Sequence, residues 1–410
     1  MSGTTSSPAL DLTVDALVDA TPDSRDRVVD LLRAVSIAVV VLWHWTFSIT
    51  QWRHGALRMP NPIGDVPGLW TATWLLQVMP LFFLVGGYAN QAGWDGVVRA
   101  GGGARRFWAK RFGRLVRPVA VYVGCWTVVD LAWRASGGRS VLDWGTVVFV
   151  PLWFLGVYVG VVALVPLTAH LHTRHRVATL VTLAIGVLAA DGLRLGADVD
   201  ASVVGLGGSA LVWIFCHQLG YVWRDWTTST RRPAESLGTP ARVDAAGGLG
   251  GAGAQVAEVA RRKARCLVAA GFGALVVLTQ LGPYSSSMVA VRGEDVSNMF
   301  PTTACIAALA VFQLGVVLTV RPALTRWLRR RRVWRTVVAA NGVAMTVFCW
   351  HMTALVVFLL AFEAAGFTLA TEPTAGWWLT RPLWVAGPAI VLAGLMAAFA
   401  RFELPTSSRR

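Results

Sequence analysis

Charged side chains are scarce in this 410-residue chain, and lysine is almost missing from it. Only 14% of the residues are Asp, Glu, Lys or Arg, and just two of them are lysines, Lys110 and Lys263. A soluble domain carries about 25% charged residues, so the composition excludes an ordinary soluble protein. Hydrophobic residues make up 55% of the chain and gather into repeated runs of bilayer length, about 17–25 residues. The sequence therefore predicts an all-α, polytopic transmembrane helical bundle.

Motifs that hold metals or phosphates are also missing. The GlyGlyGly at 101–103 has no preceding strand and no GxGxxG context, so a phosphate-cradling loop is not indicated. No CxxC or Cys/His ligand spacing occurs, and we expect no metal site, no disulfides and cysteines that are small core residues. The five cysteines lie in or at the ends of apolar runs: Cys125, Cys216, Cys266, Cys305 and Cys349.

The apolar runs predict ten spanning helices. They are expected at 28–50, 70–90, 117–134, 150–169, 177–192, 203–223, 266–282, 301–320, 334–362 and 382–400. With the N-terminus inside, the cytoplasmic segments hold 30 of the 37 Lys and Arg residues. This alternation follows the positive-inside rule, so both termini are predicted to be cytoplasmic. It also accounts for the net charge of +15 without a nucleic-acid partner.

The predicted organisation is one membrane domain with short tails. Residues 25–402 form this domain, and the Gly/Ala/Pro-rich segment 225–262 is expected to be a flexible cytoplasmic loop within it. Residues 1–24, which have no apolar segment, are expected to be a disordered cytoplasmic tail and not a cleaved leader. Residues 403–410 are expected to form a cytoplasmic C-terminal tail.

Two ionisable residues, Arg33 and His44, share one face of the first apolar helix. They are eleven residues apart, which places them within about 20° on the helix and about 16 Å along its axis. Ionisable groups inside a membrane are costly and point to function. A neutral imidazole is a competent general base. The alternatives are that Arg33 is a topological anchor and that His44 only hydrogen-bonds within the bundle.

A second basic group, Arg111, Arg114 and Arg117, begins the third helix. Spacing of three keeps these guanidinium groups adjacent on a helix, where they suit phosphate groups. Topology signalling or binding of lipid headgroups is the competing interpretation, and for Arg117 it is the favoured one. Arg111 and Arg114 remain candidates for holding a phosphate-bearing donor.

Further ionisable residues lie deeper in the predicted helices. Asp130 is expected near the middle of the third helix, where a carboxylate that orients His44 would activate it as a base. His351, in the ninth helix, either lines a substrate channel or satisfies a neighbouring carbonyl group. His217 is expected to be structural. His170, His172 and His175 are expected to be solvated in a short cytoplasmic loop.

These motifs, taken in order along 25–402, resemble those of the acyltransferase-3 family of integral-membrane acyltransferases. DLLRAVSIAVVVLWH is similar to the family's Arg-x10-His signature, and RFGRLVRP to its third-helix Arg-x-x-Arg segment. MPLFFLVGGY, PLWFLGVYVG and MTVFCWHMT resemble its second-helix, fourth-helix and late Trp-His motifs. Gly86 stands where the second-helix motif usually has Ser, and Leu31 where the first has Gly, so a hydroxyl role at position 86 is lost.

The resemblance implies an acyltransferase that uses acyl-CoA as donor. His44 would be the catalytic histidine, supported by Arg33, while Arg111 and Arg114 would bind the donor. The expected acceptor is a hydroxyl of a carbohydrate, glycolipid or secondary metabolite, as in O-acetylation, in the inner membrane of a bacterium. Two alternatives remain: a proton-coupled transporter that uses Asp130, His44 and His351 as a relay, and a non-catalytic envelope scaffold.

Overall fold

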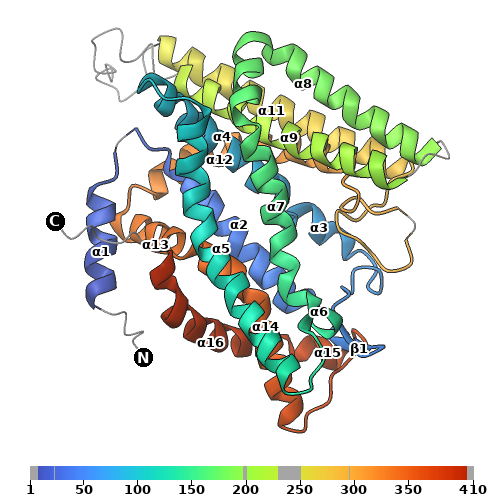
Figure 1. The fold of residues 1–410 in the computed structure, drawn as a ribbon. Helices are drawn as coiled ribbons and strands as arrows, with labels where there is room; N and C mark the ends of the chain where they lie inside the picture. The colour runs from blue at the N-terminus through green and yellow to red at the C-terminus, as the bar shows by residue number, and fades with distance from the viewer. Residues whose placement is uncertain (1–7, 23, 197–200, 230–250, 295, 404–410) are drawn as a thin grey trace. The chain divides into compact units, whose positions relative to one another are not determined.

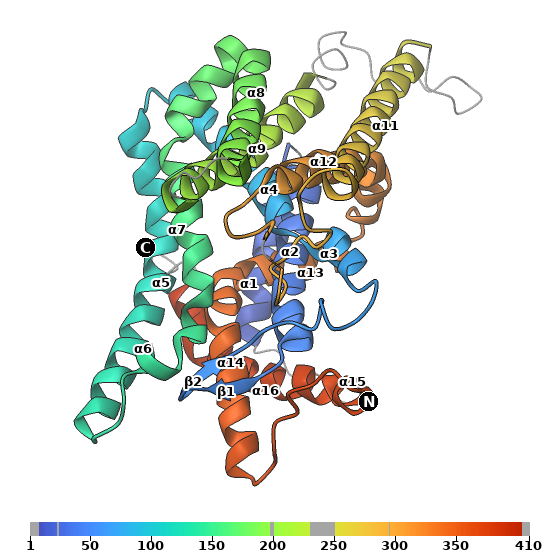
Figure 2. The same cartoon turned by 90° about the vertical axis from the view of Figure 1, so that its right-hand side faces the viewer.

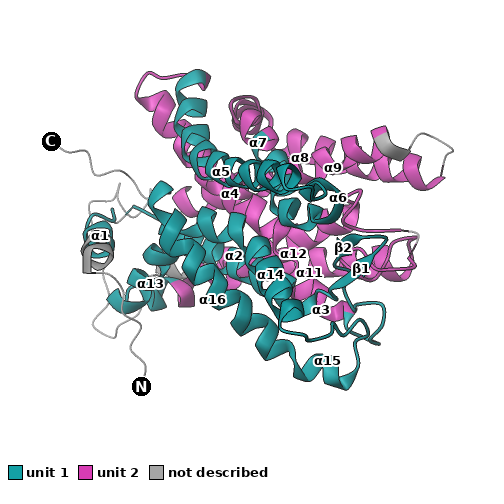
Figure 3. Ribbon diagram, turned by 60° about the horizontal axis from the view of Figure 1, so that its bottom comes forward, with its two compact units in different colours: residues 1–69, 105–159, 325–410 teal, residues 70–104, 160–324 magenta. Residues whose placement is uncertain are grey.

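The chain folds into two compact units, each built from segments that are far apart in the sequence (Figure 3). A computed structural model describes residues 8–22, 24–196, 201–229, 251–294 and 296–403. Unit 1 comprises residues 1–69, 105–159 and 325–410. Unit 2 comprises residues 70–104 and 160–324.

Unit 1 is a helical assembly with one small hairpin (Figure 1). Its elements are α1 (Pro8–Asp19), α2 (Arg27–Phe47), β1 (Gln51–Arg53), β2 (Ala56–Arg58), α5 (Ala104–Ala135, from Arg105), α6 (Val141–Trp144), η1 (Thr146–Phe149), the first part of α7 (Val150–Ala163), α13 (Arg331–Gly342), α14 (Ala344–Ala364), α15 (Ala375–Leu379), α16 (Arg381–Phe399) and η2 (Ala400–Phe402). Helices α2, α14 and α16 pack against one another and form its core.

The hairpin follows the end of α2 (Figure 2). Gln51 pairs with Arg58 and Arg53 with Ala56, in antiparallel register. His54 and Gly55 form the two-residue turn with φ values of 53° and 70°. Two positive φ values match the twist of a hairpin. These are the two strands of the described part of the chain.

Unit 2 is helical throughout its described elements. They are α3 (Trp70–Leu76), α4 (Met79–Arg99), α8 (Val165–Gly196), α9 (Ala201–Ser229), α11 (Gly251–Gln280) and α12 (Ala304–Trp327, up to Leu324). Helices α4 and α9 cross very closely at Gly87 and Gly220, where a Cβ atom on either glycine would meet the backbone of the facing helix. Small residues permit such close helix crossings in membrane proteins.

Helix α8 is a hairpin of two helices, because its backbone leaves helical geometry at His175 (φ −139°, ψ 45°). Before this kink, Thr168 contacts Tyr221 and His172 contacts Asp225, so the first part runs in the direction of α9. After it, Gly186 lies by Leu211 and Gly208 by Ala190, so the second part runs against α9. The fourth and fifth predicted spans therefore meet at a turn near His175.

The prediction of ten spans is confirmed by length and composition. Ten described helical stretches are long and apolar enough to cross a membrane: Arg27–Phe47, Trp70–Arg99, Ala104–Ala135, Thr146–Ala163, Val165–Gly196, Val203–Thr228, Ala257–Gln280, Ala304–Trp327, Ala344–Ala364 and Ala375–Phe402. The protein is thus an all-α, multi-pass membrane protein.

Two of the differences between the predicted and the observed helix boundaries affect the candidate residues. Helix α5 begins at Ala104 and not at 117, because the basic segment is rich in Arg, Lys and Ala, which favour helix. The ninth predicted span is two helices, α13 and α14, separated at Val343 (φ −122°) directly after Gly342.

Parts of the segments that were expected to be tails or a flexible loop are helical. Residues 8–19 of the expected disordered tail form α1, which packs on α13 (Figure 1). Of the expected loop 225–262, α9 takes the residues up to Ser229 and α11 those from Gly251, and 230–250 lie outside the described residues. Of the C-terminal tail 403–410, only Glu403 is described.

Candidate functional site

His44 and His351 meet inside unit 1. His44 lies in the last turn of α2, where it is half-buried, and His351 lies in the second turn of α14, where it is fully buried. Nδ1 of His44 is 3.1 Å from Nε2 of His351. Their ring centroids are 5.1 Å apart. The structure therefore joins two sequence candidates that are 307 residues apart in the chain.

Two further contacts hold His351 in place near this pair. Nδ1 of His351 lies 2.7 Å from the carbonyl oxygen of Phe348, one turn earlier in α14. Trp45, the residue after His44, donates from its indole nitrogen to the carbonyl oxygen of His351 at 3.0 Å. Both contacts are buried, and they restrain the imidazole ring and the backbone of His351.

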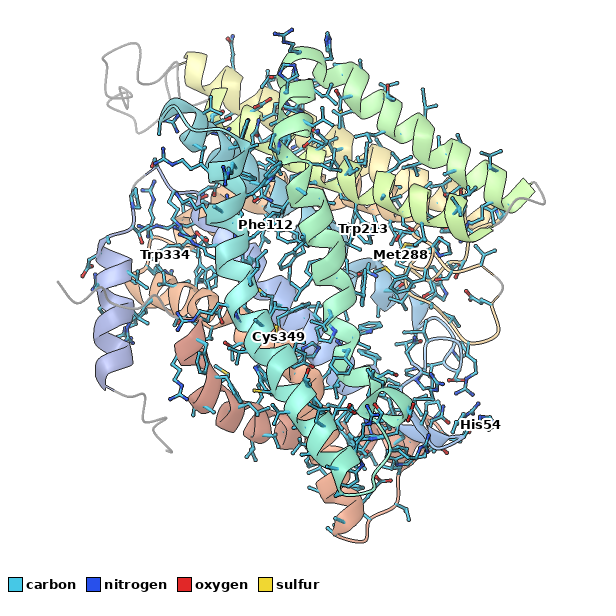
Figure 4. All side chains as sticks on the ribbon, viewed as in Figure 1. His54, Phe112, Trp213, Met288, Trp334 and Cys349 are labelled. Atoms are coloured by element: carbon cyan, nitrogen blue, oxygen red, sulfur yellow. The ribbon has the colours of Figure 1, made fainter. Side chains whose placement is uncertain are left out.

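Aromatic side chains of α5 pack against the same part of α14. Trp126 donates to the hydroxyl of Thr353 at 3.1 Å. The ring of Tyr122 meets that of Trp350 edge to face at 5.1 Å, and its hydroxyl donates to Val148. Cys349, labelled in Figure 4, is a fully buried free cysteine two residues before His351. This packing keeps water away from His351, since all these side chains except Thr353 are large or apolar.

The basic candidates also gather within unit 1. Arg33, on α2, and Arg114, on α5, are both close enough to Arg111 to interact with it electrostatically, as is Tyr158. Among the described residues, neither Arg33 nor Arg114 forms an ion pair, and Arg114 is exposed. The guanidinium of Arg111 lies over the ring of Phe107 at 5.7 Å. Three like charges gathered in this way form a site suited to an anionic ligand.

Arg117 has a different environment from Arg111 and Arg114. Its guanidinium lies 5.9 Å from the ring centroid of Phe402, in η2. Arg401 lies over the same ring at 4.9 Å. Arg117 thus helps to hold the end of the chain against α5, through cation–π contacts of about 0.5–1 kcal/mol each at exposed sites.

Asp130 lies near the end of α5 and not at its middle, because the helix begins thirteen residues earlier than predicted. Its carboxylate accepts hydrogen bonds from the Ser140 hydroxyl at 2.8 Å and from the Val141 amide at 2.7 Å. Arg134 lies 3.9 Å away. Among the described residues, the hydrogen bonds of Asp130 go to the start of α6 and none goes to His44.

Two residues not singled out from the sequence hold the ends of the histidine-bearing helices. Arg381 is 6% exposed, stacks on Trp377 at 3.8 Å, and donates towards the carbonyl of Ser48, just after α2. Glu403 accepts from the amides of Met345 and Thr346, both at 2.8 Å, at the start of α14. Burial raises the pKa of the Glu403 carboxyl. An acidic residue at a helix N-terminus and a cation at a C-terminus both stabilise the helix.

The three histidines that were predicted to lie in a cytoplasmic loop, and also His217, belong to unit 2. The prediction that His172 is solvated is wrong: it is 2% exposed, and its Nε2 lies 3.0 Å from a carboxylate oxygen of Asp225. Arg176 pairs with the same carboxylate across the kink of α8. Asp225, on α9, therefore contacts α8 on both sides of its kink. His217 is buried and lies 3.1 Å from the side-chain nitrogen of Asn90, which agrees with a structural role.

No group of three His, Cys, Asp or Glu side chains that could hold a metal ion gathers in the described parts of either unit. The polar centre of unit 1 is instead a histidine pair on α2 and α14 and an arginine cluster on α2 and α5. An anion-binding cluster and a buried imidazole base together suit the transfer of a group from a phosphate-bearing donor.

Comparison with known proteins agrees with this chemistry. A family model for the acyltransferase domain of the acyltransferase-3 family matches residues 26–400. The match covers both units and every helix from α2 to α16. No curated protein and no solved structure matches the chain. The chain therefore belongs to the acyltransferase-3 family and is a membrane-bound acyltransferase.

Proposed function

We propose that this protein moves a short acyl group, such as acetyl, from cytoplasmic acyl-CoA to a hydroxyl group of a carbohydrate, glycolipid or small metabolite. The observation that carries the proposal is the contact between His44 and His351 in a largely apolar part of unit 1. A histidine held by a second neutral group in a dry site is placed to act as a general base. The family match supplies the reaction class.

The arginine cluster supports the choice of donor. Arg33, Arg111 and Arg114 bring three positive charges together on α2 and α5. Coenzyme A carries a pyrophosphate and a 3′-phosphate, and guanidinium groups bind phosphate oxygens in bidentate fashion. Arg33 lies eleven residues before His44 on the same helix, about 16 Å along its axis. An extended pantetheine arm is of this length, so phosphates held at Arg33 leave the thioester near His44.

The reaction is balanced without another reactant. His44 takes the proton of the acceptor hydroxyl as its oxygen attacks the thioester carbonyl carbon. The carbon–sulfur bond breaks, and the leaving thiolate of coenzyme A receives the proton from His44. Alternatively, His44 attacks the thioester first and carries the acyl group to the acceptor. Both routes require an unprotonated nitrogen on His44.

The test compares three strains by mass spectrometry of envelope glycans, lipids and secreted metabolites: a deletion, a wild-type complement and a His44→Ala complement. We expect a species lighter by one acyl group in the deletion and His44→Ala strains, restored by the wild type. His170→Ala is a matched control, because His170 is exposed on α8, and it should restore acylation. Full acylation in the His44→Ala strain, with equal protein in the membrane, would remove His44 from the mechanism.

The proton-coupled transporter remains the competing function. It predicts substrate flux that depends on a proton gradient and proceeds without acyl-CoA. Purified protein in vesicles separates the two, because product formation there requires acyl-CoA in the first case only. Loss of product on omission of acyl-CoA is the result that we expect.

A further inference from the structure

The contacts of the two imidazole rings determine where their protons lie. Nδ1 of His351 faces the carbonyl oxygen of Phe348 at 2.7 Å. A carbonyl oxygen only accepts, so this nitrogen must carry a proton. A neutral imidazole has one N–H and one lone pair, and the lone pair of His351 is therefore on Nε2. That lone pair faces Nδ1 of His44 at 3.1 Å.

We propose that His351 is a positioning residue that fixes His44 in its Nδ1–H tautomer and so leaves Nε2 of His44 as the reacting nitrogen. The inference rests on the proposed function of His44 and adds to it the atom that reacts and the residue that selects this atom. The hydrogen bond made by one ring nitrogen decides which nitrogen is free to react. Here the chain of donors runs from His44 through His351 to the backbone of α14.

His351 accepts a hydrogen bond from His44, a role that a carboxylate often has beside a catalytic histidine. When Nε2 of His44 takes the acceptor proton, His44 becomes a cation that donates from Nδ1 to the lone pair of His351. This charge-assisted hydrogen bond is stronger than the neutral one. The position of His351 is 0% exposed, and an ionised carboxylate there would lose its hydration at a cost of several kcal/mol. A neutral imidazole stabilises the cation without that cost.

The alternative tautomer does not satisfy the same contacts. If His44 carried its proton on Nε2, the lone pairs of His44 Nδ1 and His351 Nε2 would face each other at 3.1 Å. Moving the His351 proton to Nε2 would remove this conflict but set a lone pair against the carbonyl of Phe348. Trp45 holds the backbone of His351 in place, so the ring cannot shift easily to relieve either conflict.

The first experiment uses two amide variants of His351 in the full-length protein. In His351→Gln the amide oxygen reaches the position of Nε2 and can accept from His44. In His351→Asn the amide reaches only the position of Nδ1, so it can still donate to Phe348 but not contact His44. Both variants keep a neutral polar side chain in the same pocket, so each controls for the effect of the other on folding.

We expect the kcat of His351→Asn to fall by about 10²- to 10⁴-fold, the scale for a catalytic imidazole that loses its orienting partner. The KM for acyl-CoA should stay within about threefold, because the arginine cluster is on other turns. His351→Gln should recover most of the lost kcat. Equal activity in the Asn and Gln variants, at equal melting temperature, would overturn the proposal, since a merely structural histidine does not distinguish them.

The second experiment observes the tautomer itself. Nitrogen-15 spectra of ring-labelled histidine distinguish Nδ1–H from Nε2–H, and the His44 signals are identified by their loss in His44→Gln. We expect Nδ1–H in the wild type and a mixture of tautomers in His351→Asn. An Nε2–H signal for wild-type His44, together with an inactive His44→Ala variant, refutes the role of His351 alone. An active His44→Ala variant refutes the proposed function as well.

Discussion

At the scale of single residues, Arg381 is the most unusual charge in unit 1. Its side chain is 6% exposed and pairs with no carboxylate of the described residues. Trp377 and Trp384 lie at 3.8 and 5.1 Å from its Cζ, and its Nε donates to the carbonyl of Trp377 at 3.1 Å. Its Nη1 points to the carbonyl of Ser48 at 3.4 Å. Arg381 thereby compensates the partial negative charge at the end of α2.

Replacement of Arg381 by methionine should therefore destabilise the protein. Met preserves apolar volume but leaves the Ser48 carbonyl group without its donor, at a cost of about 1–3 kcal/mol. The Trp377 carbonyl group keeps the Thr380 hydroxyl as a donor. Thermal melting of the purified protein in detergent measures this effect. Arg292→Met is the control, because Arg292 is exposed in a loop, and it should melt as the wild type does. Equal melting of both variants would show that Arg381 does not stabilise the end of α2.

The sequence alone identified single functional candidates better than it identified their partners. Arg33 and His44 stand out because helical periodicity places them on one face, and periodicity depends only on local geometry. The contact of His44 with His351 depends on which helices pack together, and no local pattern encodes that over 307 residues. The same limit explains why Asp130 was a candidate partner. An earlier start of α5 moves the middle of the helix away from Asp130, which accepts from the amide of Val141 at the start of α6.

At the scale of helices, the crossing of α4 and α9 is the closest contact in unit 2. A Cβ atom on Gly220 would lie 2.6 Å from the amide nitrogen of Tyr88, and one on Gly87 would meet the carbonyl of His217. Backbone atoms cannot move aside as a flexible side chain can. The crossing also places Asn90 within 3.1 Å of His217. Two glycines therefore set both the distance between the helices and their buried polar contact.

Gly87→Ala should consequently lower the melting temperature of the protein. Overpacking of a close contact costs about 1–3 kcal/mol. Gly96→Ala, on the same helix, is the matched control, since a Cβ there meets no atom within 4 Å. Alanine is also the better helix former by up to about 1 kcal/mol, so the control should be neutral or slightly stabilising. A Gly87→Ala protein as stable as the Gly96→Ala protein would contradict this close approach.

Helix α1 docks on α13 through charge, and neither helix is among the ten stretches long and apolar enough to cross a membrane. Asp19 and Asp15 pair with Arg331, and Asp15 also pairs with Arg335. The hydrogen bond from Arg331 holds the pKa of Asp19 below its usual value of 3.8. A carboxyl group with a lowered pKa contributes to docking above its unfolded pKa, and this contribution is lost as the pH falls through the folded pKa. Trp334 also donates to Thr21 at 3.1 Å, a contact that does not titrate.

We expect hydrogen exchange in α1, corrected for the intrinsic rates, to be faster at about pH 3 than at about pH 7, because carboxyl groups protonate in this interval. High salt at neutral pH should also speed it, since exposed pairs are screened. In Asp19→Asn the difference between the two pH values should shrink, with the rest left to Asp15. The same pH dependence in wild type and variant would show that the Asp19–Arg331 pair does not hold α1.

Hydropathy predicted the number of spans but not the contacts of the polar segments between them. Ten spans follow from run length because an apolar helix needs about twenty residues to cross a bilayer. The burial of His172 beside the turn and the docking of α1 were missed for one reason: polar segments have no periodic apolar signal that shows what they pack against. In both cases a carboxylate holds the polar segment in place. Asp225 contacts His172 beside the turn, and Asp19 accepts from Arg331 where α1 docks.

At the scale of the whole molecule, the candidate residues belong to one unit. Segments 1–69, 105–159 and 325–410 contribute to unit 1, and they carry all the sequence candidates: Arg33, His44, Arg111, Arg114, Asp130 and His351. The arginine cluster lies near the start of α5, and Ser136 directly follows its end. These two ends of α5 must lie on opposite sides if the helix crosses the membrane.

The side on which the arginine cluster lies decides whether cytoplasmic acyl-CoA can be the donor. The alternation that puts 30 of 37 basic residues on one side predicts that this side is the cytoplasm. Ser136→Cys and Arg329→Cys, each in a Cys266→Ser background, test it, because all three positions are exposed. A membrane-impermeant maleimide should label Ser136→Cys in intact cells and Arg329→Cys only in permeabilised ones. The reverse pattern would place Arg33, Arg111 and Arg114 outside, where acyl-CoA is absent, and the donor would have to be another anionic acyl carrier.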